Sequence, residues 1–112
     1  MADQGALDQV EPFVDEALRS LPEPLRSAAQ ELIVTVSPRS GVELYGEFYG
    51  LPKAAESGLG EPPPEVTLYA ATLVADFPDS EALRREVRRT LIHEIGHYLG
   101  LSEEDLHARG LE

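Results

Sequence analysis

The sequence predicts an α+β fold in which two strands lie between helical segments. Residues 8–21 and 80–99 carry apolar side chains at helical spacing, which predicts two amphipathic helices. Residues 31–37 and 66–75 are instead rich in β-branched and apolar side chains, which favours strands. Helix, strand, loop, strand and helix in this order are typical of the α+β class.

The N-terminal segment is predicted to form two helices followed by a strand. Pro22 and Pro24 interrupt the first helix, because proline removes a backbone donor and clashes with the preceding turn. A second, short helix is expected from about residue 24 to residue 30. The following ELIVTVS (31–37) is so dense in apolar residues that we expect a strand buried on both faces, or nearly so.

The middle of the chain gives weaker signals. GVELYGEFYGLP (41–52) combines aromatic residues with glycines and predicts a short strand with a shaped loop. KAAESGLGEPPPE (53–65) is polar and rich in glycine and proline, so we expect a surface loop. The strand pattern then resumes in VTLYAATLVA (66–75).

The C-terminal part predicts a long helix, a turn and a short closing helix. Asp79 or Ser80 provides the N-cap of the long helix, which should continue to about Leu99. GLS breaks this helix. SEEDLHARG then predicts a closing helix, with Ser102 as its cap and Asp105 as the partner in a capping box.

Charge and composition narrow the classes of partner. The chain of 112 residues is expected to form one domain, residues 1–112, with 42% hydrophobic residues and a net charge of −12. This acidity argues against nucleic acid and membrane surfaces as partners. The arginines of LRREVRRT (83–90) are interpreted as a solvated helix face, with Glu81 placed to pair with Arg85.

The same composition bears on the compartment. No apolar run approaches the roughly 18–20 residues of a membrane span, and the acidic N-terminus is unlike a secretory signal. The chain has no cysteine, so it can form neither a disulfide nor a thiolate metal site. We therefore expect a cytoplasmic protein.

Residues 90–107, TLIHEIGHYLGLSEEDLH, contain all three histidines of the chain and the H-E-x-x-H motif. On a helix, His93 and His97 project from one face about one turn apart, so both can bind one zinc ion. Glu94 lies roughly 100° round the helix, where it can contact a water on the metal as general base. The apolar stripe of Val87, Leu91, Ile95 and Tyr98 lies on the opposite face and should pack on the core.

The third ligand is predicted just beyond the helix. Gly100 can adopt the left-handed conformation that ends a helix, and a side chain there would point toward the metal. Glu103 follows three residues later, which gives H-E-x-x-H-x-x-G-x-x-E and makes Glu103 the preferred ligand. Three further side chains and an upstream group stay open as alternatives; the three are Glu104, Asp105 and His107.

Together these motifs resemble those of the short bacterial zincin-like metallopeptidases, the minimal zincins. The resemblance extends over FVDEALRSLPEPLR, LIVTVS, LYGEFYGLP, VTLYAATL and VRRTLIHEIGHYLGLSEEDL. It implies a single α+β domain, with a small mixed sheet against the HExxH helix, and an acidic third ligand that corresponds to Glu103. Tyr98 stands where members often carry another histidine. A methionine turn is absent, because Met1 is the only methionine.

The functional hypothesis is a zinc-dependent metallopeptidase with one Zn²⁺ ion per chain. Glu94 would take a proton from the metal-bound water and deliver it to the leaving amine. A peptide or protein substrate is expected to pair with an exposed edge strand, for which VTLYAATL is the candidate.

Two questions stay open. Tyr45, Tyr49 and Tyr69 are candidates to stabilise the oxyanion, although a tyrosine in such a position is more often a core or loop aromatic. The alternative function is a catalytically inactive zinc- or peptide-binding module on the same fold, because so short a chain leaves few residues for specificity pockets.

Overall fold

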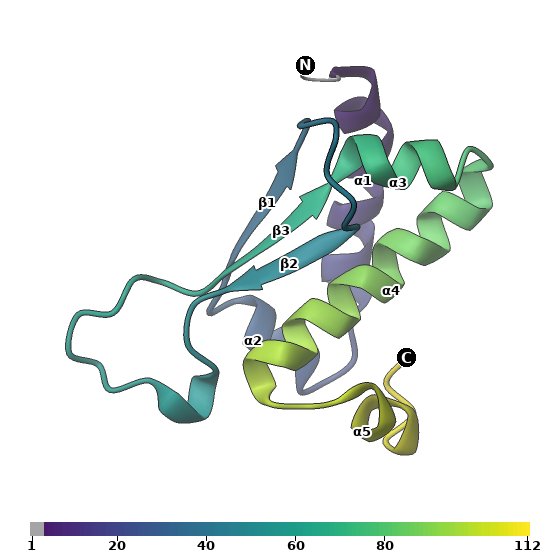
Figure 1. Ribbon diagram of the computed structural model, residues 1–112. Coiled ribbons are helices and arrows are strands. Elements are labelled where there is room, and N and C mark those ends of the chain that lie inside the picture. Colours follow the sequence, from purple (N-terminus) through teal and green to yellow (C-terminus); the bar gives the residue numbers. More distant parts are fainter. Residues whose placement is uncertain (1–3) are drawn as a thin grey trace.

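The computed structural model describes residues 4–112 and has the α+β fold predicted from the sequence. Helices and strands alternate irregularly along the chain, and Figure 1 shows the helices gathered on one side of a small sheet. The elements are α1 (Gln4–Ser20), α2 (Leu25–Ala29), β1 (Ile33–Ser37), β2 (Gly46–Tyr49), the 3₁₀ turn η1 (Lys53–Ala55), β3 (Glu65–Tyr69), α3 (Ala70–Asp76), α4 (Ser80–Leu99) and α5 (Glu103–Ala108).

The sheet is mixed and has the strand order β1-β3-β2. β3 pairs in parallel with β1 and antiparallel with β2, so that Val66 lies between Val34 and Phe48. The prediction that VTLYAATL forms an exposed edge is therefore wrong, because β3 is the central strand. The prediction that residues 31–37 form a strand buried on both faces is also wrong. β1 is an edge strand, and its exposed residues alternate with half-buried ones until Val36.

One face of the sheet packs against α1 and α4. Val66 and Leu68 of β3 are buried there, and Val34 and Phe48 from the two edge strands pack against the same core. The opposite face, where side chains alternate, leaves Ile33 and Tyr49 exposed. The long helix α4 is thus held against the sheet by its apolar side.

The segment predicted as one strand, residues 66–75, divides into two elements. β3 ends at Tyr69, and α3 begins at Ala70. Within α3, Ala70 and Leu73 are the buried residues, three positions apart as on a helix face. A run of small and apolar residues fits either period, and packing against α1 and α4 decides here for the helix.

The ends of the C-terminal helices follow the local sequence signals. The Asp79 side chain accepts a hydrogen bond from the backbone N–H of Ala82 at 3.0 Å, so Asp79 is the N-cap of α4. The capping box of Ser102 and Asp105 is formed at α5 as predicted. The expected Glu81–Arg85 pair is replaced by a contact of 3.7 Å between Glu81 and Arg84. None of the helices in residues 4–112 combines the length and apolarity that crossing a membrane requires.

Candidate metal centre

The H-E-x-x-H residues lie on the outward side of α4. The side chains of His93 and Glu94 are 20% and 14% exposed, whereas that of His97 is 59% exposed. The predicted apolar stripe on the other side of the helix is fully buried, from Val87 to Tyr98. The helix therefore presents its polar side to solvent while its apolar side anchors it in the core.

Two carboxylates lie next to the imidazole of His93. Its Nε2 atom is 3.7 Å from Oε1 of Glu103 and 3.6 Å from Oε1 of Glu112. The three ligand atoms all lie within 4.8 Å of one another. Nε2 of His93 is buried and has no hydrogen-bond partner among the described residues. The structure thus brings Glu103 to His93 and adds Glu112, which sequence reasoning missed.

His97 points to a different neighbour. Its Nδ1 atom lies 3.0 Å from Oε1 of Glu94, one turn back along the helix. His97 is not one of the three residues grouped around His93. In this arrangement Glu94 orients the ring of His97, whose side chain is mostly exposed.

The alternative third ligands have other surroundings. The carboxylate of Asp105 accepts a hydrogen bond from the backbone N–H of Ser102 at 2.9 Å, and this bond lowers the pKa of Asp105. His107 is exposed, and its Nδ1 atom lies 3.9 Å from Oε2 of Glu112. Glu104 is exposed on α5 and does not join the group around His93.

Two glycines bring α5 close to α4. A Cβ atom at Gly96 would lie 3.2 Å from the buried Leu106 and 3.5 Å from the carbonyl oxygen of Leu101, so the missing side chain lets α5 approach. Gly100 has φ +74°, and its Cβ would meet nothing within 4 Å. Gly100 is therefore explained by its left-handed backbone and not by lack of space.

The turn at Gly100 has the hydrogen bonds of a Schellman motif. The N–H of Leu101 donates to the carbonyl oxygen of Gly96 at 2.8 Å, and that of Gly100 donates to His97 at 3.1 Å. These bonds satisfy carbonyls at the end of α4 and direct the chain back along it. As a result the first residue of α5, Glu103, faces His93.

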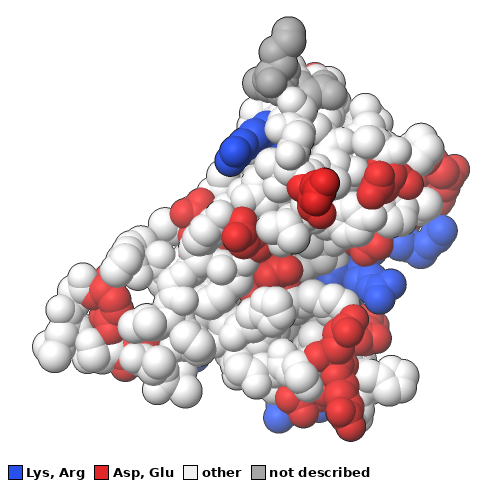
Figure 2. Space-filling view, viewed as in Figure 1, with Lys and Arg blue, Asp and Glu red and all other residues white. Residues whose placement is uncertain are grey.

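The three side chains His93, Glu94 and Glu103 line two adjoining hollows of about 500 and 480 Å³. The first is bounded by residues 43–46 and α4, and the second by the turn after α4 and by α5. Figure 2 shows acidic side chains gathered over the α5 end of this face, with basic side chains beside them over α4. One basic group, Arg89, lies 3.9 Å from Oε1 of Glu103.

The backbone of β2 lies directly against the catalytic candidate on α4. A Cβ atom at Gly46 would be 2.6 Å from Cγ2 of Thr90 and 3.3 Å from Cγ of Glu94. β2 is also an edge strand, so within residues 4–112 one side of its backbone has no strand partner. The glycine thus allows an unpaired strand edge to lie beside the metal-site candidates.

Of the three candidate tyrosines, the structure brings only Tyr45 into this cleft. Its hydroxyl donates to Asp76 at 2.7 Å, and this hydrogen bond raises the pKa of Tyr45. The hydroxyls of Tyr49 and Tyr69 both donate to Glu47, at 2.5 and 2.8 Å. Glu47 follows Gly46 and points to the sheet face away from α4, so these two tyrosines are remote from Glu94.

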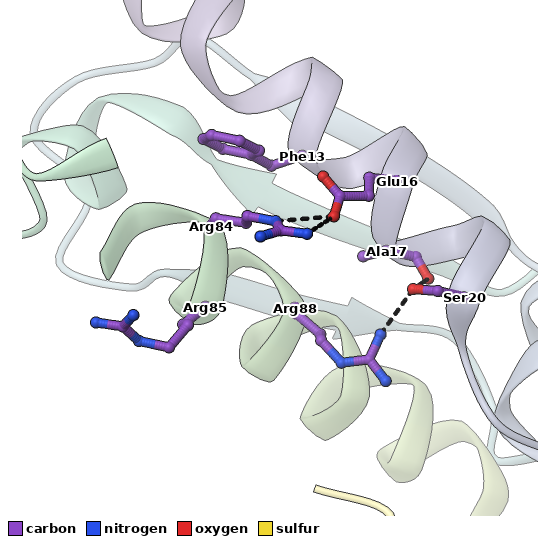
Figure 3. A pocket seen from close by; sticks show the side chains of 7 residues that line it. All are labelled: Phe13, Glu16, Ala17, Ser20, Arg84, Arg85 and Arg88. Atoms are coloured by element: carbon purple, nitrogen blue, oxygen red, sulfur yellow. Dashed lines mark hydrogen bonds and ion pairs between the residues drawn. The ribbon is translucent and has the colours of Figure 1, made fainter. Parts of the chain in front are cut away.

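A separate hollow of about 320 Å³ lies between α1 and α4 (Figure 3). Arg84 is hydrogen-bonded to Glu16, and Arg88 donates to the hydroxyl of Ser20 at 2.9 Å, whereas Arg85 points away. The prediction of a solvated arginine face is thus incomplete, because two arginines connect α4 to α1. By helical spacing they lie on the opposite side of α4 from His93.

Comparison with known protein families gives one match. A family described as zincin-like metallopeptidase matches residues 24–111, which include α4 and α5. No curated protein matches the chain.

Proposed function

The chain belongs to the zincin-like metallopeptidase family, and we propose that it hydrolyses peptide bonds at a zinc site formed by His93, His97 and Glu103. Glu94 is the general base of this proposal. The observation that carries it is the buried, unpartnered Nε2 atom of His93, which faces the carboxylate of Glu103. A buried polar atom without a partner is unfavourable, and a bound cation would provide that partner.

The chemistry of the donor atoms fits zinc. Imidazole nitrogen and carboxylate oxygen both bind this ion at about 2.0–2.2 Å, so ligand atoms of a tetrahedral site are roughly 3.4 Å apart. The separation of 3.7 Å between His93 and Glu103 is close to that value. His97 can join them by turning its exposed ring away from Glu94, because residues four apart share a helix face.

Zinc bound here would lower the pKa of a water molecule toward about 7 and polarise a substrate carbonyl. In that chemistry Glu94 would take up a proton from the attacking water and pass it to the amine of the leaving peptide. Its side chain lines both hollows, so water and substrate can reach the carboxylate. Its neighbour Gly46 keeps the space beside the Glu94 stem free.

The substrate in this proposal is an extended peptide that pairs with the free edge of β2. This assignment replaces the sequence-based choice of β3, which has a strand on each side. Main-chain hydrogen bonds to an edge strand give affinity without deep side-chain pockets. A small chain can therefore bind peptides even though its cleft is shallow. Tyr45 lines the same cleft and could approach the substrate carbonyl once it releases Asp76.

The alternative is a catalytically inactive zinc- or peptide-binding module on the same fold. The specific observation in its favour is Glu112, whose carboxylate lies as close to His93 as that of Glu103. Closed zinc sites have four protein ligands, whereas catalytic sites keep one position for water.

Metal analysis and peptide cleavage together test the proposal. Protein purified without added zinc should contain about one equivalent, and His93→Ala should lose it. Glu94→Gln should keep the zinc but lose hydrolysis of a peptide library. Glu104→Gln is the matched control, because Glu104 is an exposed acid outside the group around His93, and it should keep both properties.

These experiments distinguish the metallopeptidase from the inactive module. A wild-type protein that binds no zinc, even when zinc is supplied, would refute both zinc functions. Zinc-loaded wild type that cleaves no peptide would support the inactive module.

A further inference from the structure

We propose that Glu112 is an additional ligand of the zinc site, and that it closes the position that water needs once His97 has also turned toward the ion. This inference rests on the proposed function, because it requires zinc at His93. It assigns a role to a residue outside the H-E-x-x-H-x-x-G-x-x-E motif.

The first argument is position. Oε1 of Glu112 lies 3.6 Å from the buried Nε2 of His93, and Oε1 of Glu103 lies 3.7 Å from the same atom. All three ligand atoms lie within 4.8 Å of one another. By distance to His93, Glu112 is therefore as well placed as the ligand predicted from the motif.

The second argument is that the fold constructs this position. Gly110 has φ +66°, and its N–H donates to His107 at 3.0 Å. The N–H of Leu111 donates to Leu106 at 2.9 Å, which completes the same Schellman pattern that follows α4. Leu111 is buried in the core next to Glu112. One glycine turn thus places Glu103, and a second places Glu112.

The third argument concerns the orientation of the carboxylate. One oxygen of Glu112 faces His93, and the other lies 3.9 Å from Nδ1 of His107. This second contact is exposed and too long for a hydrogen bond, so the orientation argument rests on the oxygen that faces His93.

The chemical consequence follows from ligand number. His93, His97 and Glu103 leave one position of a tetrahedral ion for water. A fourth ligand from Glu112 fills that position and adds a negative charge, which strengthens zinc binding but displaces the nucleophile. Release of Glu112, for example when a peptide occupies the cleft, would restore the open site.

The test compares wild type with Glu112→Gln, Glu103→Gln and the control Glu104→Gln. Zinc affinity is measured by competition with a chelator, and a change in the groups that bind the metal is followed by the visible absorption of the Co²⁺-substituted protein. Loss of even an outer-shell partner lowers metal affinity roughly 10–100-fold, so we expect at least a tenfold loss for Glu112→Gln. Its Co²⁺ spectrum should change, and peptide hydrolysis at saturating zinc should increase.

Each contrary result has a distinct meaning. Unchanged zinc affinity and an unchanged Co²⁺ spectrum in Glu112→Gln would overturn the ligand assignment and leave the proposed function intact. Weaker zinc binding without faster hydrolysis would overturn the closure of the site. A wild-type protein that binds no zinc would instead remove the proposed function on which the inference rests.

Discussion

Replacing Gly100 by alanine tests how the turn after α4 forms the metal site. The glycine has φ +74°, a conformation that costs a non-glycine L residue about 1–2 kcal/mol. No atom lies within 4 Å of the added Cβ, so no steric overlap contributes. Alanine also restricts the unfolded chain, which offsets about 0.4–1 kcal/mol. The expected net loss is about 1 kcal/mol, or roughly 4 °C in melting temperature for a domain of this size.

The loss of zinc affinity should exceed what this loss of stability explains. If the turn relaxes to relieve the alanine, Glu103 moves away from His93 and the site loses a ligand. Denaturant unfolding with a chelator present gives the stability of the metal-free protein, and chelator competition gives the zinc affinity. Gly41→Ala is the matched control, because Gly41 has φ +80° and equally open surroundings outside the metal site.

Three results would refute this reasoning. If Gly100→Ala costs no stability, the left-handed backbone is not what requires the glycine. If it loses stability but binds zinc as tightly as Gly41→Ala does, the turn does not place a ligand. Asparagine tolerates the left-handed region better than alanine does, so Gly100→Asn should recover part of both losses. Failure of that rescue would also count against the argument.

Three further predictions concern the surrounding structure. Burial raises the pKa of Tyr98 to about 12, above the value of about 10 in an unfolded chain. The stability that the neutral, buried phenol contributes is therefore complete below about pH 10 and is lost as the pH rises through about 12. Tyr98→Phe should abolish that part of the alkaline destabilisation in thermal melts, and it should cost about 1 kcal/mol at neutral pH for the lost bond to Glu56. Ser102→Ala removes the N-cap of α5 and should cost about 1 kcal/mol, seen as faster amide exchange confined to that helix. Gly46→Ala should lower the free energy of unfolding by roughly 1–3 kcal/mol, because the added Cβ would lie 2.6 Å from Cγ2 of Thr90. Thr90→Ser removes that methyl group and should relieve the overlap. A double-mutant cycle that shows no coupling between the two substitutions would contradict this explanation.

The parts of the fold that depend on neighbouring residues could be predicted from the sequence. The caps at Asp79 and Ser102 and the glycine turn after α4 are formed as expected, because each depends on hydrogen bonds within a few residues. The apolar stripe of α4 was predictable for the same reason, since helical spacing alone determines which side chains share a face. These local features position His93, Glu94 and Glu103.

The parts that depend on distant pairing could not be predicted. Whether β3 is central or at an edge is decided by its pairing with β1 and β2, and the residues of β3 alone do not indicate which strands will pair with it. The helix α3 was misassigned as strand, because Ala70 to Asp76 has no strong period and packing decides its conformation. Glu112 was missed because its position depends on the burial of Leu111 and on the turn at Gly110.

Metal binding and the docking of α5 should be coupled. Both carboxylates near His93 lie on or just after this helix, which has only six residues. A helix so short is not stable alone, so its position depends on its cap and on the contact of Leu106 with Gly96. A ligand at 100 times its dissociation constant stabilises the state that binds it by about 2.7 kcal/mol, which is more than one cap contributes. In the proposed site, bound zinc therefore stabilises the docked position of α5, and docked α5 in turn stabilises bound zinc. Any substitution that loosens the helix must also lower the affinity for zinc.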